Sequence, residues 1–583
     1  MINNCMKSIT RWKPLSGCWN ILEKTNRSFA SFTIKDILYE TSDEAGTLLT
    51  RFAKHVAIER QKICEEIPTK VQYADYFPVS DIRYFQRELS KTPTNQLASV
   101  IVFASSYRPN ADPGKFAIIL NEMDKFAMEN VEKMDADTIL RTLYSFLFLI
   151  PNWMTKLDFY TAAMKNLLRN AQKDCESKEL FIQTCFYFGL SKNLSRGNLA
   201  NSWKLFVEAH LSRFLPQMGV LDLALVASAI YKTSTKIENE NFNQRLVDGV
   251  LSFSLAEGGN DALLITFIKS LRFQRVNSTD VCKHLTNICT NPNKLRQFQP
   301  RGQIHMFAFF ADNLWDNSAA ANTLVDEFIR NLKMPPKNTY ADRVRGKDIA
   351  SFLWCCSQLN YRMSREQFCV VEDNLLEKVQ KNEFVYFPDQ LVESCLSLWI
   401  LGFKSKELLH HAVSLKLQAQ SKRHQPKVDS RLTVLLSAAH IEEPTWCSSL
   451  PKSFKSFDLN SAVPQYLLNT SIPYQAIISQ LCESEKVSSV KIACPISGIN
   501  IPGLVVKTST SNTPFFVEFM TESQTLLTSR QPVAILRLKI QLLQSMGHKV
   551  RVLTPEDLVN PLDENDILDI ETNAELSRNS IKS

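Results

Sequence analysis

The chain has 583 residues, too many for one hydrophobic core, so we expect several domains or an elongated array of repeats. Charged residues make up 22% and hydrophobic residues 44%, as in ordinary water-soluble proteins, and no apolar run reaches the ~18 residues of a membrane span. Only 15 glycines occur, which disfavours a glycine-rich β-sandwich and favours helices with short polar connections.

The net charge of +7 is unevenly distributed. Residues 556–583 hold eight acids and two bases, so this acidic tail contributes −6 and the rest of the chain carries +13. The basic body is compatible with nucleic-acid binding but does not require it.

The N-terminal segment 1–35 has six bases, one acid and no continuous apolar core. This composition is typical of a mitochondrial or plastid transit peptide and excludes a secretory signal. A disordered basic tail is the alternative. Acidic residues return from Asp36 onward, so we expect an N-terminal extension over residues 36–80.

An internal repeat dominates residues 81–445 and predicts a mainly α-helical fold. An apolar residue opens the same helical pattern at intervals of 41 to 45 residues, and a second amphipathic stretch lies between successive openers. The openers are Leu97, Ile139, Leu180, Leu221, Leu263, Ile304, Ile349, Leu391 and Leu432. Because one helix pair cannot bury its apolar face alone, we expect about nine pairs with a period of about 42 to stack as an α-solenoid.

Solenoids of this period bind either proteins or single-stranded RNA, so the repeat alone does not choose between them. Near its end, four bases, Lys416, Lys422, Arg423 and Lys427, lie in a stretch with a single acid. They form a candidate RNA-phosphate site, and a solvated helix face is the alternative. Residues 446–486 are expected to be a linker.

Residues 487–555 have a different pattern and predict a small α/β domain. Val487–Cys494, Leu504–Lys507 and Pro514–Phe519 are apolar, β-branched runs between turn residues, as strands are. Pro532–Met546 is expected to be a helix capped by Gly547, and Val550–Leu553 a final strand.

The segments PFFVEFMTE (514–522), the helix with Leu536, Lys539, Leu542 and Leu543, and MGHKVRV (546–552) resemble the RAP domain. The matching motif residues are Glu518, Leu543 and Gly547. The resemblance implies an RNA-associated protein of mitochondria or plastids with helical repeats before the domain, similar to the Fas-activated serine/threonine kinase family and to apicomplexan organellar RAP proteins. It also implies a restriction-endonuclease-like fold.

A nuclease of that type needs two acids and a lysine two residues after the second acid. Met520 occupies the lysine position, and no acid lies between Glu485 and Glu518, so we expect no catalytic residues. The fourteen cysteines contain no C-x-x-C pair, and no nucleotide-binding motif occurs, so neither a metal nor another cofactor is expected. Arg537, Lys539, Lys549 and Arg551 form a second candidate RNA-binding group.

The sequence therefore predicts a non-enzymatic, RNA-binding protein of the mitochondrial matrix, with a plastid-type organelle as the alternative location. Its expected partners are single-stranded or ribosomal RNA, with no small-molecule substrate and no membrane span. It would act in RNA processing, stability, translation or mitoribosome assembly. The rival hypothesis is a structural solenoid that binds mitoribosomal or other organellar proteins.

Overall fold

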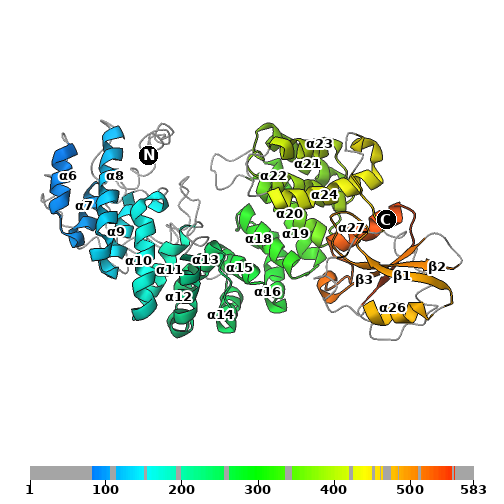
Figure 1. Ribbon diagram of the computed structural model, residues 1–583, viewed down its shortest axis with the longest axis horizontal. Helices are drawn as coiled ribbons and strands as arrows, with labels where there is room; N and C mark the ends of the chain where they lie inside the picture. The colour runs from blue at the N-terminus through cyan, green and yellow to red at the C-terminus, as the bar shows by residue number, and fades with distance from the viewer. Residues whose placement is uncertain are drawn as a thin grey trace. The chain divides into compact units, whose positions relative to one another are not determined.

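The computed structural model describes residues 82–554, except 105–112, 150–153, 192–198, 255–260, 335–343, 419–424, 449–453, 460, 462, 464–473, 484 and 510–513, together with residue 557. The predicted leader 1–35, the extension 36–80 and nearly all of the acidic tail lie outside these residues. Within them, no helix has both the length and the apolar character required to cross a bilayer. The described residues fall into two compact units (Figure 1).

The first unit is helical, and each helix contacts the helix two places along the chain. One row contains α7, α9, α11, α13 and α15, and a second row contains α6, α8, α10, α12 and α14. The helices are α6 (Ile82–Lys91), α7 (Leu97–Ala104), α8 (Pro113–Asn130), α9 (Ala136–Leu149), α10 (Asp158–Asp174), α11 (Lys178–Gly189), α12 (Leu199–Phe214), α13 (Val220–Thr233), α14 (Glu240–Leu251) and α15 (Asp261–Gln274).

The second unit continues this alternation and adds the terminal α/β domain. Helices α18, α20, α22 and α24 form one row, and α19, α21 and α23 form the other. The elements are α16 (Thr279–Cys289, mostly in this unit), α17 (Pro292–Leu295), α18 (Pro300–Asp312), α19 (Ser318–Lys333), α20 (Gly346–Gln358), α21 (Arg365–Gln380), α22 (Pro388–Ile400), α23 (Lys406–Gln418) and α24 (Gln425–Glu442).

The nine opener residues predict the helices correctly. Each lies in a different helix, namely α7, α9, α11, α13 and α15 in the first unit and α18, α20, α22 and α24 in the second. Six of the nine are buried and three are half-buried. Many helices of the other row begin at capping side chains, since Asn239, Asn317 and Ser364 each accept a hydrogen bond from a backbone N–H of the first turn.

Five of the helices that contain an opener end in the same left-handed turn, namely α13, α15, α18, α20 and α22. Ser234, Arg275, Leu314, Asn360 and Gly402 all have a positive φ, at intervals of 39 to 46 residues. The N–H of the next residue donates to the carbonyl five residues earlier, at 2.9 to 3.1 Å in every case. This Schellman closure satisfies carbonyls that the helix leaves unpaired and turns the chain toward the next helix.

The terminal domain has the element order α26 (Tyr474–Cys482), β1 (Val487–Ala493), β2 (Gly503–Thr508), β3 (Phe515–Phe519), α27 (Ala534–Ser545), β4 (Val550–Leu553). Strands β1, β2 and β3 pair antiparallel in chain order, and β4 pairs parallel to β3. The parallel pair requires a crossover, which α27 provides. The predicted strands and helix are confirmed, and α26 lies in the segment expected to be linker.

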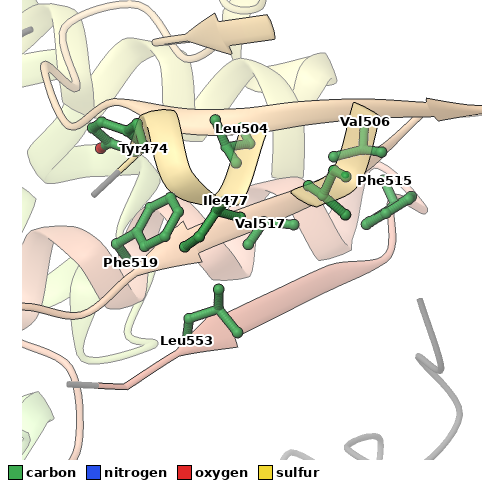
Figure 2. Packing of buried hydrophobic residues seen from close by; sticks show 9 residues of the cluster. Tyr474, Ile477, Leu504, Val506, Phe515, Val517, Phe519 and Leu553 are labelled. Carbon is green, nitrogen blue, oxygen red and sulfur yellow. The ribbon is translucent and has the colours of Figure 1, made fainter. Parts of the chain in front are cut away.

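Helices cover both faces of this sheet (Figure 2). On one face, Tyr474 and Ile477 of α26 pack with Leu504, Val517 and Phe519. The strand alternation sends Glu518 to the opposite face, where α27 lies. Because helices cover both faces, every residue of β3 is buried. The sequence of β3 therefore shows little alternation between apolar and polar residues.

Helix α27 also contacts α20, α22 and α24, so it lies between the sheet and the helical row of the second unit. The residue ten positions after each opener is aliphatic or aromatic in the first eight repeats, but in the ninth it is Glu442, at the end of α24. Its carboxylate accepts hydrogen bonds from Trp399, Gln541 and Ser545, the last two on α27. The departure from the repeat therefore marks the place where the terminal domain docks.

Candidate nucleic-acid interface

The centre of the terminal domain is a buried ion pair between β3 and α27. Lys539 Nζ lies 2.6 Å from each carboxylate oxygen of Glu518 and donates a hydrogen bond to Oε2. It also donates to the carbonyl of Ile501 at 2.9 Å. Neither side chain has any exposed area. The pair joins the helix to the sheet, because separating them would leave two uncompensated charges in the core.

The local backbone is built around the Glu518 carboxylate. A Cβ atom on Gly503, which faces Glu518 from β2, would lie 2.5 Å from Oε1, so only glycine fits there. Burial raises the pKa of Glu518, and the Lys539 charge opposes that rise. Tyr474 donates to the carbonyl of the neighbouring Pro502 at 3.0 Å. These contacts enclose the carboxylate and leave no opening for a ligand.

This geometry bears on nuclease chemistry. The position beside Glu518 on β2 is Gly503, and a second acid is therefore missing from the place where a metal-dependent nuclease would need one. The lysine that Glu518 contacts comes from α27, not from the strand position held by Met520. Among the described residues, no group of three or more His, Cys, Asp or Glu side chains is arranged to hold a metal.

Two residues of the second predicted RNA-binding group, Lys539 and Arg537, take part in packing within the second unit. The prediction for Lys539 is wrong, because its side chain is in the core. Arg537 donates to the carbonyls of Pro532 and, on α20, Ser357, and burial lowers its pKa to about 10. Its guanidinium therefore joins the terminal domain to the helical row, but Arg537 is half-buried, so its role as a phosphate contact stays a prediction.

The other two residues of this group lie on or next to β4, at one edge of the sheet. Lys549 is exposed and Arg551 is half-buried. Residues two apart on a strand point to the same face, so these side chains are neighbours. They remain a candidate site for phosphate. The motif residue Gly547 has φ +83° and closes α27 as predicted, and Leu543 is buried.

The first predicted basic group includes residues from the end of α23 and the start of α24. Lys416 is in α23, and Lys427 is exposed in the first turn of α24. Lys422 and Arg423 lie outside the described residues, so this group stays a prediction.

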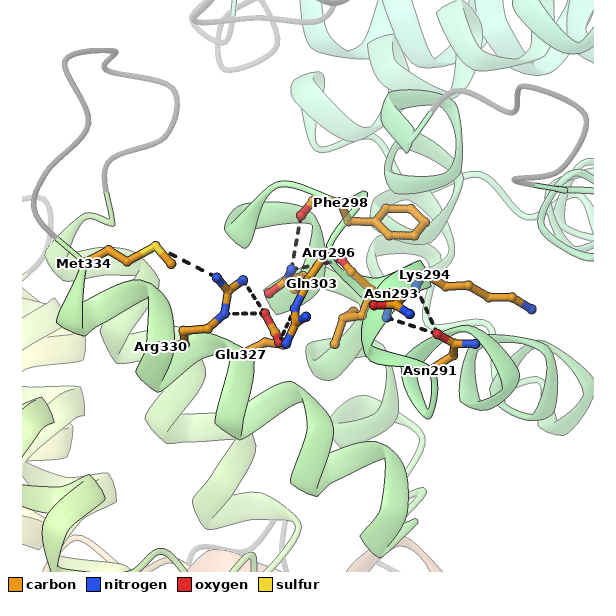
Figure 3. Close-up of polar contacts among 10 residues, drawn as sticks. Asn291, Asn293, Lys294, Arg296, Phe298, Gln303, Glu327, Arg330 and Met334 are labelled. Atoms are coloured by element: carbon orange, nitrogen blue, oxygen red, sulfur yellow. Dashed lines mark hydrogen bonds and ion pairs between the residues drawn. The ribbon is translucent and has the colours of Figure 1, made fainter.

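Sequence reasoning missed a paired-arginine cluster in the second unit (Figure 3). Glu327 of α19, almost fully buried, accepts from Arg296 Nε at 2.8 Å and from Arg330 Nε at 2.9 Å. Arg296 follows α17, and the pair joins α17 to α19. No sequence signal joins residues 31 positions apart, although Glu327 and Arg330 have the spacing of a helical ion pair.

The two guanidiniums share one carboxylate, so the cluster has a net positive charge. Burial raises the pKa of Glu327, but the hydrogen bonds from Arg296 and Arg330 outweigh it and the net pKa is lowered. The side chains of Arg296 and Arg330 are 49% and 40% exposed. Arginine side chains that are held in place, with some N–H groups still able to donate hydrogen bonds, are suited to bind phosphate.

Comparison with known proteins gives distant relatives. A stretch of 211 residues is 21% identical to "FAST kinase domain-containing protein 5, mitochondrial" of Homo sapiens. The proteins of the same name from Pongo abelii and Macaca fascicularis are 22% identical over 214 residues and 20% identical over 211 residues. Each match covers 36% of this chain and 25% of the relative's length. No protein-family model matches the chain.

Proposed function

We propose that this chain is a mitochondrial RNA-binding protein without catalytic activity, built as an α-solenoid that ends in a RAP-like domain. The observation that carries the proposal is the similarity to FAST kinase domain-containing protein 5, whose name includes "mitochondrial". The terminal motif residues resemble the same family. The motif residues and the matched stretch favour the same class of protein.

The structure supports this proposal at three points. Helices alternate between two rows within each unit, as helix-pair repeats do. The order α26-β1-β2-β3-α27-β4, with a parallel final strand, agrees with the expected nuclease-like α/β fold. The Glu518 carboxylate has a lysine and a glycine beside it instead of a second acid, which favours a structural role.

The proposal includes RNA processing, stability, translation or mitoribosome assembly as the process. Single-stranded or ribosomal RNA is the proposed partner, and a leader in residues 1–35 would direct the chain to the matrix. The rival is a structural subunit that binds organellar proteins. Contacts among helices favour neither, because protein-binding and RNA-binding solenoids pack alike.

A salt titration of the purified full-length protein with single-stranded RNA tests RNA binding. We expect the affinity to fall with salt, at a log–log slope of about −0.7 for each neutralised phosphate. Deleting residues 556–583 should leave the affinity unchanged or improve it, because the tail is acidic. Charge reversal at Lys427 and Lys416 should flatten the slope if that group binds phosphate. Absence of binding at low salt would contradict the proposal.

Fusing residues 1–40 to a reporter tests the location. We expect the reporter to enter mitochondria, because the segment is basic and nearly free of acids. A reporter that stays diffuse in the cytosol would contradict the targeting part of the proposal and leave RNA binding to the titration above.

A further inference from the structure

In the first unit, aromatic and basic side chains meet where α13 and α15 end. Tyr231, Lys236, Phe273 and Arg275 define this surface, which we name the α13–α15 edge. The rings of Tyr231 and Phe273 are perpendicular, with centroids 6.0 Å apart. Lys236 Nζ lies 4.6 Å from the centroid of Phe273 and donates to the Phe273 carbonyl. Tyr231 is 36% exposed, and Lys236 and Arg275 are exposed.

The charge of this edge is one-sided. Residues 223–237 and 262–279 hold five bases and no acid, namely Lys232, Lys236, Lys269, Arg272 and Arg275. The acids that flank these two ranges are Asp222, Glu238, Asp261 and Asp280. Burial and the charge of Arg275 lower the pKa of Lys236, as expected where bases crowd together. Lys232 and Arg272 are in the last turns of their helices, where they also favour the helix dipole.

In the second unit, the corresponding helix ends contact the terminal domain. Tyr231 and Phe273 are ten residues after their openers, and Leu314 and Leu359 hold that position in the second unit. There the carbonyl of Leu314 accepts from Leu527 N at 3.0 Å, and the carboxylate of Asp316 accepts from Thr528 N and Ser529 N. Arg537 reaches the Ser357 carbonyl. Helix ends of this row are therefore covered by the chain's own terminal domain.

At the α13–α15 edge, the position ten residues after the opener holds the aromatic rings of Tyr231 and Phe273, with bases nearby. The same position in the second unit holds Leu314 and Leu359. An exposed ring offers a face for a planar partner, and a group of neighbouring bases favours a polyanion. Single-stranded nucleic acid has both properties, whereas a duplex hides its base faces. An acidic peptide would satisfy the charges but would not need the aromatic side chains.

We propose that the α13–α15 edge binds single-stranded RNA, with a base stacked on Tyr231 and phosphates on Lys236 and Arg275. The inference rests on the proposed RNA-binding function and adds the location and the chemistry of one contact. Arg272 and Lys232 contribute to the local positive potential.

The test compares variants of the full-length protein for binding to a short labelled single-stranded RNA of mixed sequence. Tyr231→Leu places the repeat's own residue type at this position and removes the ring, so the fold should be retained. We expect it to bind about tenfold more weakly, or about 1.4 kcal/mol. Tyr231→Phe keeps the ring and should bind as the wild type does. Arg275→Asn suits the φ of +60° and should reduce the salt slope by about 0.7.

Lys165→Gln, at an exposed base on α10 of the same unit, is the matched control and should leave affinity and slope close to wild type. Wild-type binding that Tyr231→Leu and Arg275→Asn leave unchanged would overturn this site but not the proposed function. Absence of wild-type binding would overturn both. If an acidic peptide binds the α13–α15 edge and RNA does not, the edge is a site for a protein partner and the RNA site is overturned.

Discussion

Glu518 and Lys539 form an ion pair in the core of the terminal domain, with Nζ 2.6 Å from each carboxylate oxygen and no exposed area on either side chain. The same two residues belong to the motif that made the domain resemble an RNA-associated family. Their geometry assigns them to stability, and the RNA contacts that we propose involve other residues.

Removing one member of this pair should destabilise the terminal domain strongly. For Glu518→Gln or Lys539→Met we expect a loss of about 3–5 kcal/mol in the free energy of unfolding, because the remaining group stays buried without its partner. Hydrogen exchange of β3 and α27 peptides measures the loss locally. The double variant Glu518→Leu/Lys539→Met should recover much of it. Single variants with wild-type protection would show that the pair contributes little.

Gly503→Ala should destabilise the same domain. The added methyl group would lie 2.5 Å from Glu518 Oε1, and the enclosed carboxylate has little room to move. We expect faster hydrogen exchange in β2 and β3. Gly547→Ala is a useful comparison, because no atom lies within 4 Å of its added Cβ and its cost comes from φ +83° alone. Normal exchange in Gly503→Ala would contradict the close packing described.

Glu327→Gln should lower stability at neutral pH by about 1–3 kcal/mol, since two arginines lose their charged acceptor. The pKa of Glu327 is lowered in the folded state, so its contribution is present above the unfolded value near 4.5 and is lost as pH falls through the folded pKa. The difference between wild type and variant should therefore narrow in acid. A difference that is constant from pH 7 to below 4 would contradict this assignment.

Purified protein should not cleave RNA in the presence of Mg²⁺ or Mn²⁺. Glu518 has no second acid beside it on β2 and no exposed area, so it cannot position a metal or a water molecule against a phosphate. A gel assay with labelled RNA measures cleavage. Turnover that requires the metal and disappears in Glu518→Ala would contradict the structural role of this residue.

Much of the fold was predictable because burial imposes a period on the sequence. The openers every 41 to 45 residues identified nine helices, and the apolar runs identified four strands. Glu442 broke the pattern for a reason visible only in three dimensions, namely its contacts with α27. The α26 helix was assigned to a linker, because its apolar face becomes meaningful only against the sheet.

The candidate site was harder to predict. Lys539 lies three residues after Leu536 and three before Leu542, on the apolar face of its helix, and Glu518 lies within the apolar strand FFVEF. Opposite charges on two faces that are both expected to be buried predict an ion pair in the core. The sequence therefore contained the information needed to place Glu518 and Lys539 together. The cluster of Arg296 and Glu327 gave no comparable signal, because the contact joins residues that are distant in the sequence.

RNA binding in mitochondria is the proposed function on which the other assignments depend. The most direct measurement is ultraviolet crosslinking of the tagged full-length protein in intact cells, followed by isolation of mitochondria and sequencing of the bound RNA. We predict that defined mitochondrial transcripts or ribosomal RNA are enriched over an untagged control, and that crosslinked peptides include the ends of α13 or α15. Recovery of defined protein partners with no RNA above the control would contradict the claim and favour the protein-binding solenoid.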